Sequence, residues 1–199
     1  MISEVTICNS ALDILGANVI VSLDEETEEA RLCRRNYPLV LADCLATHFW
    51  NFSIRRVELS ELPDPPVFEF ENRYALPGDC VRVIALDPER EDFKIEGKEL
   101  ITDADSAMIK YISNDVNPSE FSPQFVEGLA YKLASKLAYP LVQSVSLSTA
   151  LNNKADQMLR IARGTDGQEG TPELLQRDEW LDARIVRDIP YRVSSDLEP

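Results

Sequence analysis

The stretch formed by residues 24–52 constrains the fold more than any other, because the period of its hydrophobic pattern changes near its end. Asp24 can cap a helix, and the four glutamates that follow it place negative charge at the positive end of the helix dipole. Apolar or small residues then recur in steps of three or four, at Ala30, Cys33, Tyr37, Leu41, Cys44 and His48. This spacing predicts a helix with one buried stripe. After Thr47 the alternation is every second residue, which predicts a strand.

Pro38 lies in the middle of this predicted helix. It removes the hydrogen bond that its amide would give to the Arg34 carbonyl, and its ring crowds the preceding turn. Because the apolar stripe continues past it, we expect a kink in the helix rather than its end.

Helical patterns also occupy residues 3–15, a segment that starts at Pro118 or Ser122, a segment from Ser146 or Ser148 to Gly164, and residues 171–184. Ser3 is the expected cap of the first helix, and Gly16 is its expected stop. The last of these segments is strongly polar, so it can hardly stay folded alone.

From about Phe52 to Ser113 the pattern predicts five or six short strands separated by Pro, Gly and Asp. Glu96 and Gly97 are the expected turn of a hairpin. Such strands suggest a small antiparallel sandwich or barrel. Its expected core residues are Phe70, Tyr74, Val83, Ile95 and Ile109.

The predicted fold class is therefore α+β, with a helical bundle domain formed by residues 1–51 and 114–170. The β domain is inserted at residues 52–113, and a C-terminal helix with an extended arm forms residues 171–199. Residues 185–199 show no periodicity, which suggests ordering on binding. The apolar anchors that we expect to dock on another subunit or protein are Trp180, Leu181, Ile185, Val186, Ile189 and Tyr191.

The net charge of −15 is spread along the chain. Residues 1–50, 51–113 and 114–199 carry acid excesses of 5, 6 and 4, so neither an acidic tail nor a basic stripe stands out. Binding to the phosphate backbone of DNA needs clustered Lys and Arg, which this pattern does not provide. A solvated acidic surface and the wall of a passage that repels DNA phosphates both fit these charges.

No segment predicts catalytic, cofactor-binding or metal-binding residues. The four cysteines lack metal-site spacing, so we expect reduced, metal-free thiols, most of them buried. A single histidine, His48, excludes a multi-histidine metal site and is expected to pack or bond locally at the helix exit. Asp103 and Asp105 could hold a cation, but a polar turn is the preferred interpretation. No signal peptide or membrane span is predicted, so we expect a soluble chain made in a cytosol.

Five segments in series carry a resemblance to a known family: SLDEETEEARLCRRNYPLVLADCLATHFWNF, YALPGDCVRVIAL, KIEGKELITD, FSPQFVEGLAYKLASKLAYPL and QEGTPELLQRDEWLDAR. Together they resemble the tail tubular protein A family, the head–tail adaptors of short-tailed bacteriophages and their prophages. None of them is a catalytic signature, and the resemblance rests on their order along nearly the whole chain.

The resemblance implies a structural virion protein of the phage tail, assembled in the host cytoplasm. In that family identical subunits form a closed ring, usually of twelve, at the head–tail junction. The ring lies below the portal protein, continues the channel for double-stranded DNA without binding it specifically, and is the platform for the tail nozzle protein and possible tail fibres. No enzyme activity, cofactor or membrane partner is implied.

Two other classes of function stay open from the residues alone. The first is an acidic DNA-mimic protein that occupies a nucleic-acid-binding protein, although the even spread of charge argues against it. The second is a cell-wall hydrolase that uses a carboxylate pair, for which the sequence offers many candidate pairs and no signature.

Overall fold

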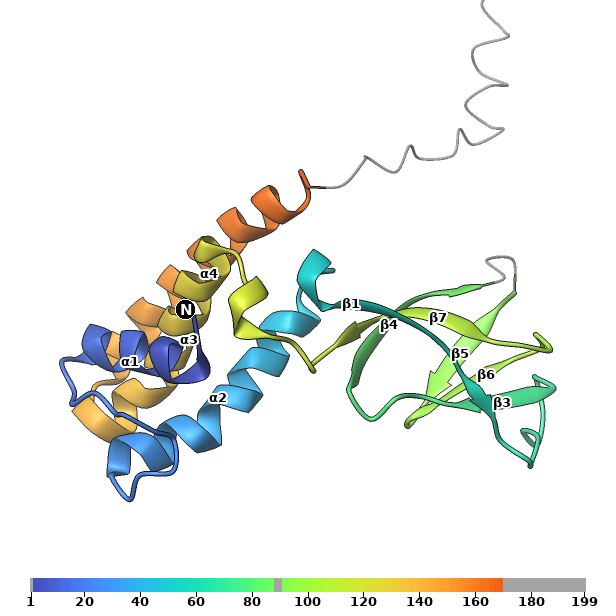
Figure 1. The fold of residues 1–199 in the computed structure, drawn as a ribbon, viewed down its shortest axis with the longest axis horizontal. Coiled ribbons are helices and arrows are strands. Elements are labelled where there is room, and N and C mark those ends of the chain that lie inside the picture. Colours follow the sequence, from blue (N-terminus) through green and yellow to red (C-terminus); the bar gives the residue numbers. More distant parts are fainter. Residues whose placement is uncertain (1, 88–90, 170–199) are drawn as a thin grey trace, which may run out of the picture. The chain divides into compact units, whose positions relative to one another are not determined.

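The computed structural model describes residues 2–87 and 91–169. These residues form a mixed α+β fold with four α-helices and two antiparallel sheets (Figure 1). The predicted fold class is thus confirmed at the level of α+β. The predicted helix and arm after residue 170 lie outside the described residues.

The first two helices are α1 (Glu4–Leu15) and α2 (Glu28–Ala46). As predicted, the Ser3 side chain caps α1, and Gly16 ends it in the left-handed conformation at φ 68°. The expectation that Asp24 caps α2 is wrong, because the cap is Thr27, whose hydroxyl accepts from the Ala30 amide.

A local turn explains why α2 begins late. The Glu25 carboxylate accepts hydrogen bonds from the amides of Val21 and Ser22, at 2.6 and 2.9 Å. These bonds satisfy backbone donors outside the helix and hold the chain in a turn before Thr27. The Glu25 carboxylate, which was expected to interact with the helix dipole of α2, therefore stabilises the preceding loop instead.

The other two helices are α3 (Pro123–Val142) and α4 (Val145–Asp166). Ser122 caps α3, which continues past Pro140 and ends where Gln143 adopts φ 54°. Ser144, rather than Ser146 or Ser148, caps α4. The predicted stop at Gly164 is also wrong, because α4 continues to Asp166.

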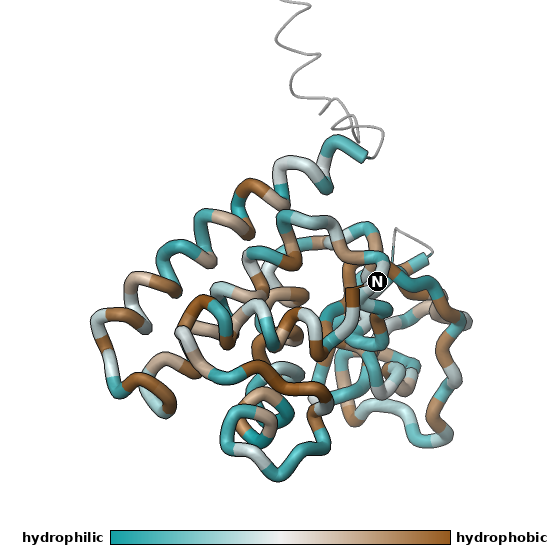
Figure 2. The backbone as a smooth tube through the Cα atoms, turned by 60° about the vertical axis from the view of Figure 1, so that its left-hand side comes forward, coloured by the Kyte–Doolittle hydropathy of each residue, from teal (hydrophilic) through white to brown (hydrophobic). Residues whose placement is uncertain are grey.

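The helical core gathers around α3, which packs against α1, α2 and α4. Ala30, Cys33, Tyr37, Leu41 and Cys44 are all buried, which confirms the predicted stripe as far as Cys44. Its last predicted member, His48, lies beyond the end of α2 and is partly exposed. Figure 2 shows the same alternation of hydrophilic and hydrophobic residues along the helices. Gly128 of α3 packs tightly against α4, because a methyl group at this position would lie 2.9 Å from the Leu159 side chain.

Seven strands lie between α2 and α3: β1 (Ile54–Glu58), β2 (Ser60–Glu61), β3 (Asn72–Ala75), β4 (Cys80–Asp87), β5 (Phe93–Glu96), β6 (Glu99–Thr102) and β7 (Met108–Ser113). Short 3-10 helices flank them at Asn51–Ser53 and Pro118–Glu120. The first sheet has the strand order β1-β7-β4 and the second has the order β2-β3-β6-β5, both antiparallel. The predicted hairpin is present as β5 and β6, with Gly97 at φ 62° in its turn. Neither sheet closes into a barrel within the described residues.

The β segment has its own apolar cluster, which includes Tyr74 and Ile109, with Val83 packed against it. The prediction for Ile95 is wrong, because this side chain is 42% exposed. Ile95 lies on β5, which pairs with β6 alone among the described strands, so one side of it faces solvent. Phe70 is also outside the cluster and lies instead beside Lys94, whose ammonium is 5.7 Å from the ring centroid.

Replacing Gly128 by alanine should weaken the packing of α3 on α4. The added carbon would lie 2.9 Å from the Leu159 side chain and 3.2 Å from the Leu159 amide nitrogen. Overpacking of this kind costs about 1–3 kcal/mol of unfolding free energy. Gly164→Ala is the matched control, because nothing lies within 4 Å of its added carbon and alanine favours a helix interior by about 1 kcal/mol. Urea unfolding measures both, and equal stabilities for the two variants would contradict the close approach.

The stability of the β segment should depend on pH through Asp79. Hydrogen bonds from the hydroxyls of Ser113 (2.5 Å) and Tyr111 (3.2 Å) hold its pKa below the ordinary value of 3.8. The stabilisation is therefore present above pH 3.8 and is lost as the pH falls through the lowered pKa. Ser113→Ala should remove about 1 kcal/mol at pH 7 and flatten the dependence of unfolding free energy on pH. Ser119→Ala, at an exposed position, is the control, and identical acid profiles for all three proteins would refute this role of Asp79.

Candidate interaction site

An aromatic cluster joins the helical core to the first strand. Trp50 is fully buried, and its indole NH donates to the Cys44 carbonyl at 3.0 Å. Phe52 and Phe125 pack against it, and Phe121 packs against both of these rings, with ring centroids 4.7–5.9 Å apart along the cluster. Aromatic pairs at these distances stabilise a core beyond the area that they bury. The cluster therefore fixes the point where the chain leaves α2 for β1.

The end of α4 is tied to the same point by Asp166. Its carboxylate accepts a hydrogen bond from the backbone amide of Asn51 at 3.1 Å and lies 3.2 Å from Nε2 of His48. The Asn51 side chain donates to the Asp166 carbonyl at 2.8 Å. Burial raises the pKa of Asp166, although the Asn51 hydrogen bond and the nearby imidazole oppose that shift. We call these three residues the Asp166 clamp.

The clamp corrects two predictions made from the sequence. His48 was expected to pack or bond locally, and it does pack on Trp50, with ring centroids 4.9 Å apart, but its polar partner Asp166 is on α4, more than a hundred residues away in the chain. Asp166 was placed in a loop after Gly164, whereas it forms the last helical residue of α4. Nothing in the local sequence around Asp166 indicates a partner at Asn51, since the two segments meet only in the folded chain.

The predicted docking residues Trp180, Leu181, Ile185, Val186, Ile189 and Tyr191 lie outside the described residues. Their role stays a prediction. The described chain does establish where this segment starts, because Glu169 follows the Asp166 clamp by three residues.

Pro38, the other predicted site residue, lies within α2, which continues on both sides of it. The proline therefore does not end the helix, and the bend that we expect there stays a prediction. It lines a cleft of about 250 Å³, together with Glu4, Leu23, Arg34, Tyr37, Leu41 and Asn114. The buried Tyr37 hydroxyl has no hydrogen-bond partner among the described residues, and burial raises its pKa.

The four cysteines are free thiols. Cys8, Cys33 and Cys44 are buried, as their positions on apolar faces predicted, and Cys80 is partly buried. Burial raises the pKa of Cys44 to about 12, and a hydrogen bond with Cys33 raises the pKa of Cys8. The Cys8 and Cys44 thiols are therefore largely protonated at neutral pH and are poor nucleophiles. The same hydrogen bond lowers the pKa of Cys33, although burial opposes that shift.

The other candidate groups belong to the local structure. Asp103 accepts from the Glu71 amide at 2.9 Å, as a residue of a polar turn does. Within residues 2–87 and 91–169, no cluster of three or more His, Cys, Asp or Glu side chains is arranged to hold a metal ion. None of the helices in this part of the chain has the length and apolar character needed to span a membrane.

No protein-family model matches the sequence, and no curated protein sequence matches it.

Removing the carboxylate of the clamp should loosen the end of α4. Asp166→Ala leaves the Asn51 amide and the His48 ring without their acceptor, which costs about 1–3 kcal/mol of unfolding free energy. Hydrogen exchange of the Asn51 amide should also become faster. Asp166→Asn keeps an acceptor oxygen and should cost less, and Glu169→Ala, at an exposed carboxylate, is the control. Unchanged exchange at Asn51 in Asp166→Ala would refute the clamp.

Proposed function

We propose that the protein is a head–tail adaptor of a short-tailed bacteriophage or a prophage. Identical subunits would form a closed ring, with about twelve members, below the portal protein. The observation that carries this proposal is the ordered resemblance of five segments to the tail tubular protein A family, from the acidic turn before α2 to the segment that ends at Arg184. No single segment carries it, because each by itself is too unspecific.

The described fold is compatible with an adaptor function. We infer a helical bundle domain from residues 1–51 and 114–170, with residues 52–113 as its inserted β domain. The strands lie between α2 and α3 in the chain. The aromatic cluster around Trp50 packs at the point where the chain passes from α2 to the strands. A ring component needs separate surfaces for its neighbours, for the ring above and for the ring below, and a two-part subunit can provide them.

The charge of the chain also supports a channel component. We infer that part of the acid excess faces the channel, so that phosphates of the passing DNA meet a repulsive wall. The tail nozzle, and tail fibres where present, would attach below the ring. The virion would be its final location and the host cytoplasm its place of assembly.

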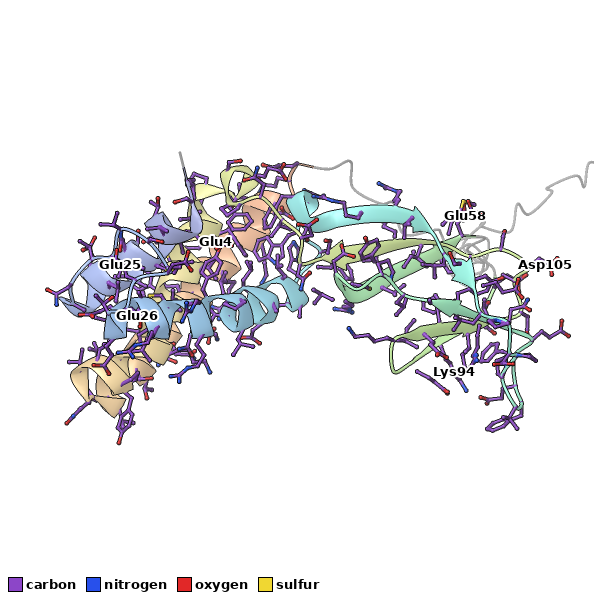
Figure 3. The ribbon with its side chains drawn as sticks, turned by 60° about the horizontal axis from the view of Figure 1, so that its bottom comes forward. Glu4, Glu25, Glu26, Glu58, Lys94 and Asp105 are labelled. Carbon is purple, nitrogen blue, oxygen red and sulfur yellow. The ribbon has the colours of Figure 1, made fainter. Side chains whose placement is uncertain are left out.

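The acidic DNA-mimic alternative receives less support. A mimic presents its carboxylates on one face, so that they replace a row of phosphates. Here Glu4, Glu25 and Glu26 belong to the helical segment, whereas Glu58 and Asp105 belong to the β segment (Figure 3). Acid excess is thus present on both parts of the fold.

The hydrolase alternative lacks a suitable acid among the described residues. A general acid near neutral pH needs a raised pKa and access to the substrate. Asp166 is the described carboxylate whose pKa is raised, but it is 7% exposed and is bound by Asn51 and His48. It stabilises the fold rather than a reacting group.

Negative-stain electron microscopy of the purified chain, alone and with portal protein, tests the proposal. We expect rings on the portal. A chain ending at residue 170 should remain folded, with near-normal helix content, but should no longer join the portal, because it lacks the predicted docking segment. Trp180→Ala in the full chain should weaken attachment by about 2 kcal/mol or more if this aromatic side chain is a hot spot.

Two outcomes would count against these proposals. A wild-type chain that neither forms rings nor binds portal would refute the adaptor function. A truncated chain that binds portal with full affinity would leave the adaptor function in place but would move the interface to the described residues.

A further inference from the structure

The loop between β2 and β3 presents two adjacent apolar side chains to solvent. Val67 is 98% exposed and Phe68 is 75% exposed. Pro65 and Pro66 directly precede them, and the fixed φ of each proline restricts the backbone that leads to this tip. Neighbouring apolar side chains that find no place in their own core mark a contact site for another protein. We call residues 64–71 the Val67 loop.

The Val67 loop is held in one conformation by the strands beside it. The Glu71 amide donates to the Asp103 carboxylate at 2.9 Å, and the Lys94 ammonium donates to the Glu69 carboxylate at 2.7 Å. Glu69 itself has φ 76°, a conformation that is costly for a residue with a Cβ atom and persists only where the surroundings enforce it. A loop fixed in this way loses little conformational entropy when it binds.

Carboxylates surround the apolar tip. Residues 57–72 contain no lysine or arginine and five acids, Glu58, Glu61, Asp64, Glu69 and Glu71. Lys94 neutralises Glu69, whereas Asp64 and Glu71 are exposed and form no salt bridge with any described residue. The Val67 loop with Lys94 therefore keeps two negative charges. It fits a protein pocket with an apolar floor and a basic rim, and it would repel the phosphates of duplex DNA.

A groove on the helical part of the chain has this composition. Its volume is about 560 Å³, and its lining residues are Glu28, Arg31, Leu32, Arg35 and Pro140. Leu39 lies one turn beyond Arg35 on α2 and is 67% exposed, so it extends the apolar area past the end of this lining. We call this surface the α2–α3 groove.

The charge of the α2–α3 groove is opposite to that of the Val67 loop. Arg31 and Arg35 are exposed, and neither forms a salt bridge within the part of the chain that the structure describes. Arg34, which pairs with Asp24 at 3.9 Å, does not line the groove. Glu28 is the one acid in the lining, so two arginines and one glutamate leave a single positive charge there.

The side chains of the tip suit the groove in size and chemistry as well. Its volume lies within the range of about 300–1,000 Å³ that is usual for pockets that enclose a ligand. An aromatic ring such as Phe68 is attracted to a guanidinium group that lies over its face. Arg31 and Arg35 can therefore contact both the ring and the carboxylates beside it.

We propose that the Val67 loop of one subunit inserts Val67 and Phe68 into the α2–α3 groove of a second copy of this chain. Asp64 and Glu71 then approach the arginines at the rim. The two surfaces belong to different elements, so the contact is heterologous, and a repeated heterologous contact builds closed rings or filaments. The inference deepens the adaptor proposal, on which it rests, by naming the contact between neighbours in the ring.

An exchange of charges tests the proposal in the full-length chain. The groove variant carries Arg31→Glu and Arg35→Glu, and the loop variant carries Asp64→Lys and Glu71→Lys. Circular dichroism verifies folding, and analytical ultracentrifugation at low and high salt measures self-association. We expect each variant alone to associate at least about tenfold more weakly than the wild type, and salt to weaken the wild-type contact.

An equal mixture of the two variants should associate again. The reversed loop of one variant fits the reversed groove of the other, and the unchanged loop and groove also remain complementary. The control carries Lys98→Glu and Arg160→Glu, which change the net charge as the groove variant does but lie at exposed positions outside both surfaces. Association of the groove variant at the level of the control, failure of the mixture, or a wild type that stays monomeric at both salt concentrations would each overturn the proposal.

Truncation of the tip tests the apolar part of the contact. Phe68→Ala should weaken self-association at least about tenfold at both salt concentrations, as expected for an aromatic anchor. Ile161→Ala is the control, because Ile161 is 49% exposed on α4 and lies outside both surfaces. Equal association of the two variants would refute the insertion of the tip.

Zero-length crosslinking with a carbodiimide identifies the occupant of the groove. Arg35→Lys keeps the charge and supplies an amine, which should join Asp64 or Glu71 of another copy in a mixture of isotope-labelled and unlabelled chains. Crosslinks to acids of residues 170–199 instead would assign the groove to that segment and overturn the proposal. If the groove variant forms complete rings on portal as the wild type does, this contact fails and the adaptor function stands. If the wild type forms no rings on portal but the charge exchange succeeds, the adaptor function fails and the contact stands.

Discussion

The burial of Trp50 is the interaction on which the rest of the described structure depends. Its ring has no exposed surface, and its one polar atom is satisfied by the Cys44 carbonyl at the end of α2. Because Phe125 belongs to α3 and Phe52 precedes β1, the same side chain holds together segments far apart in the chain. Loss of an aromatic side chain from such a core costs about 3–5 kcal/mol. That cost is comparable with the net stability of many small domains.

Local chemistry explains which parts of the fold could be predicted from the sequence. Ser3, Gly16 and Ser122 act within one turn of their own position, so their roles as caps and stop are evident without knowledge of the fold. The stripe on α2 and the hairpin at Gly97 depend in the same way on periodicity and turn chemistry. The change of period after Thr47 marks the end of α2, but the strand predicted directly after it begins only at Ile54, because residues 51–53 form a 3-10 helix.

Long-range pairing explains most of what the sequence did not predict. Asp166 extends α4 past Gly164 because its carboxylate finds the Asn51 amide, a contact between distant segments. Ile95 follows the alternation of a buried strand, but its strand lies at a sheet edge, and strand order is not a local property. Thr27 caps α2 in place of Asp24, because the Glu25 carboxylate accepts hydrogen bonds from the amides of Val21 and Ser22 and so holds the chain in a turn before the helix. At the candidate site, Asp166, Asn51 and His48 could each be located in the sequence, whereas their contact required the folded chain.

The Asp166 clamp has a mechanical consequence for the chain that follows it. A helix normally unravels most easily from its last turn, where carbonyl groups lack partners. Here a pull on the chain beyond Glu169 reaches Asn51 and His48 before it can peel α4 away from α3. A pull at Glu169 is therefore shared between the last turn of α4 and the root of β1, and it reaches the helical core at the buried Trp50.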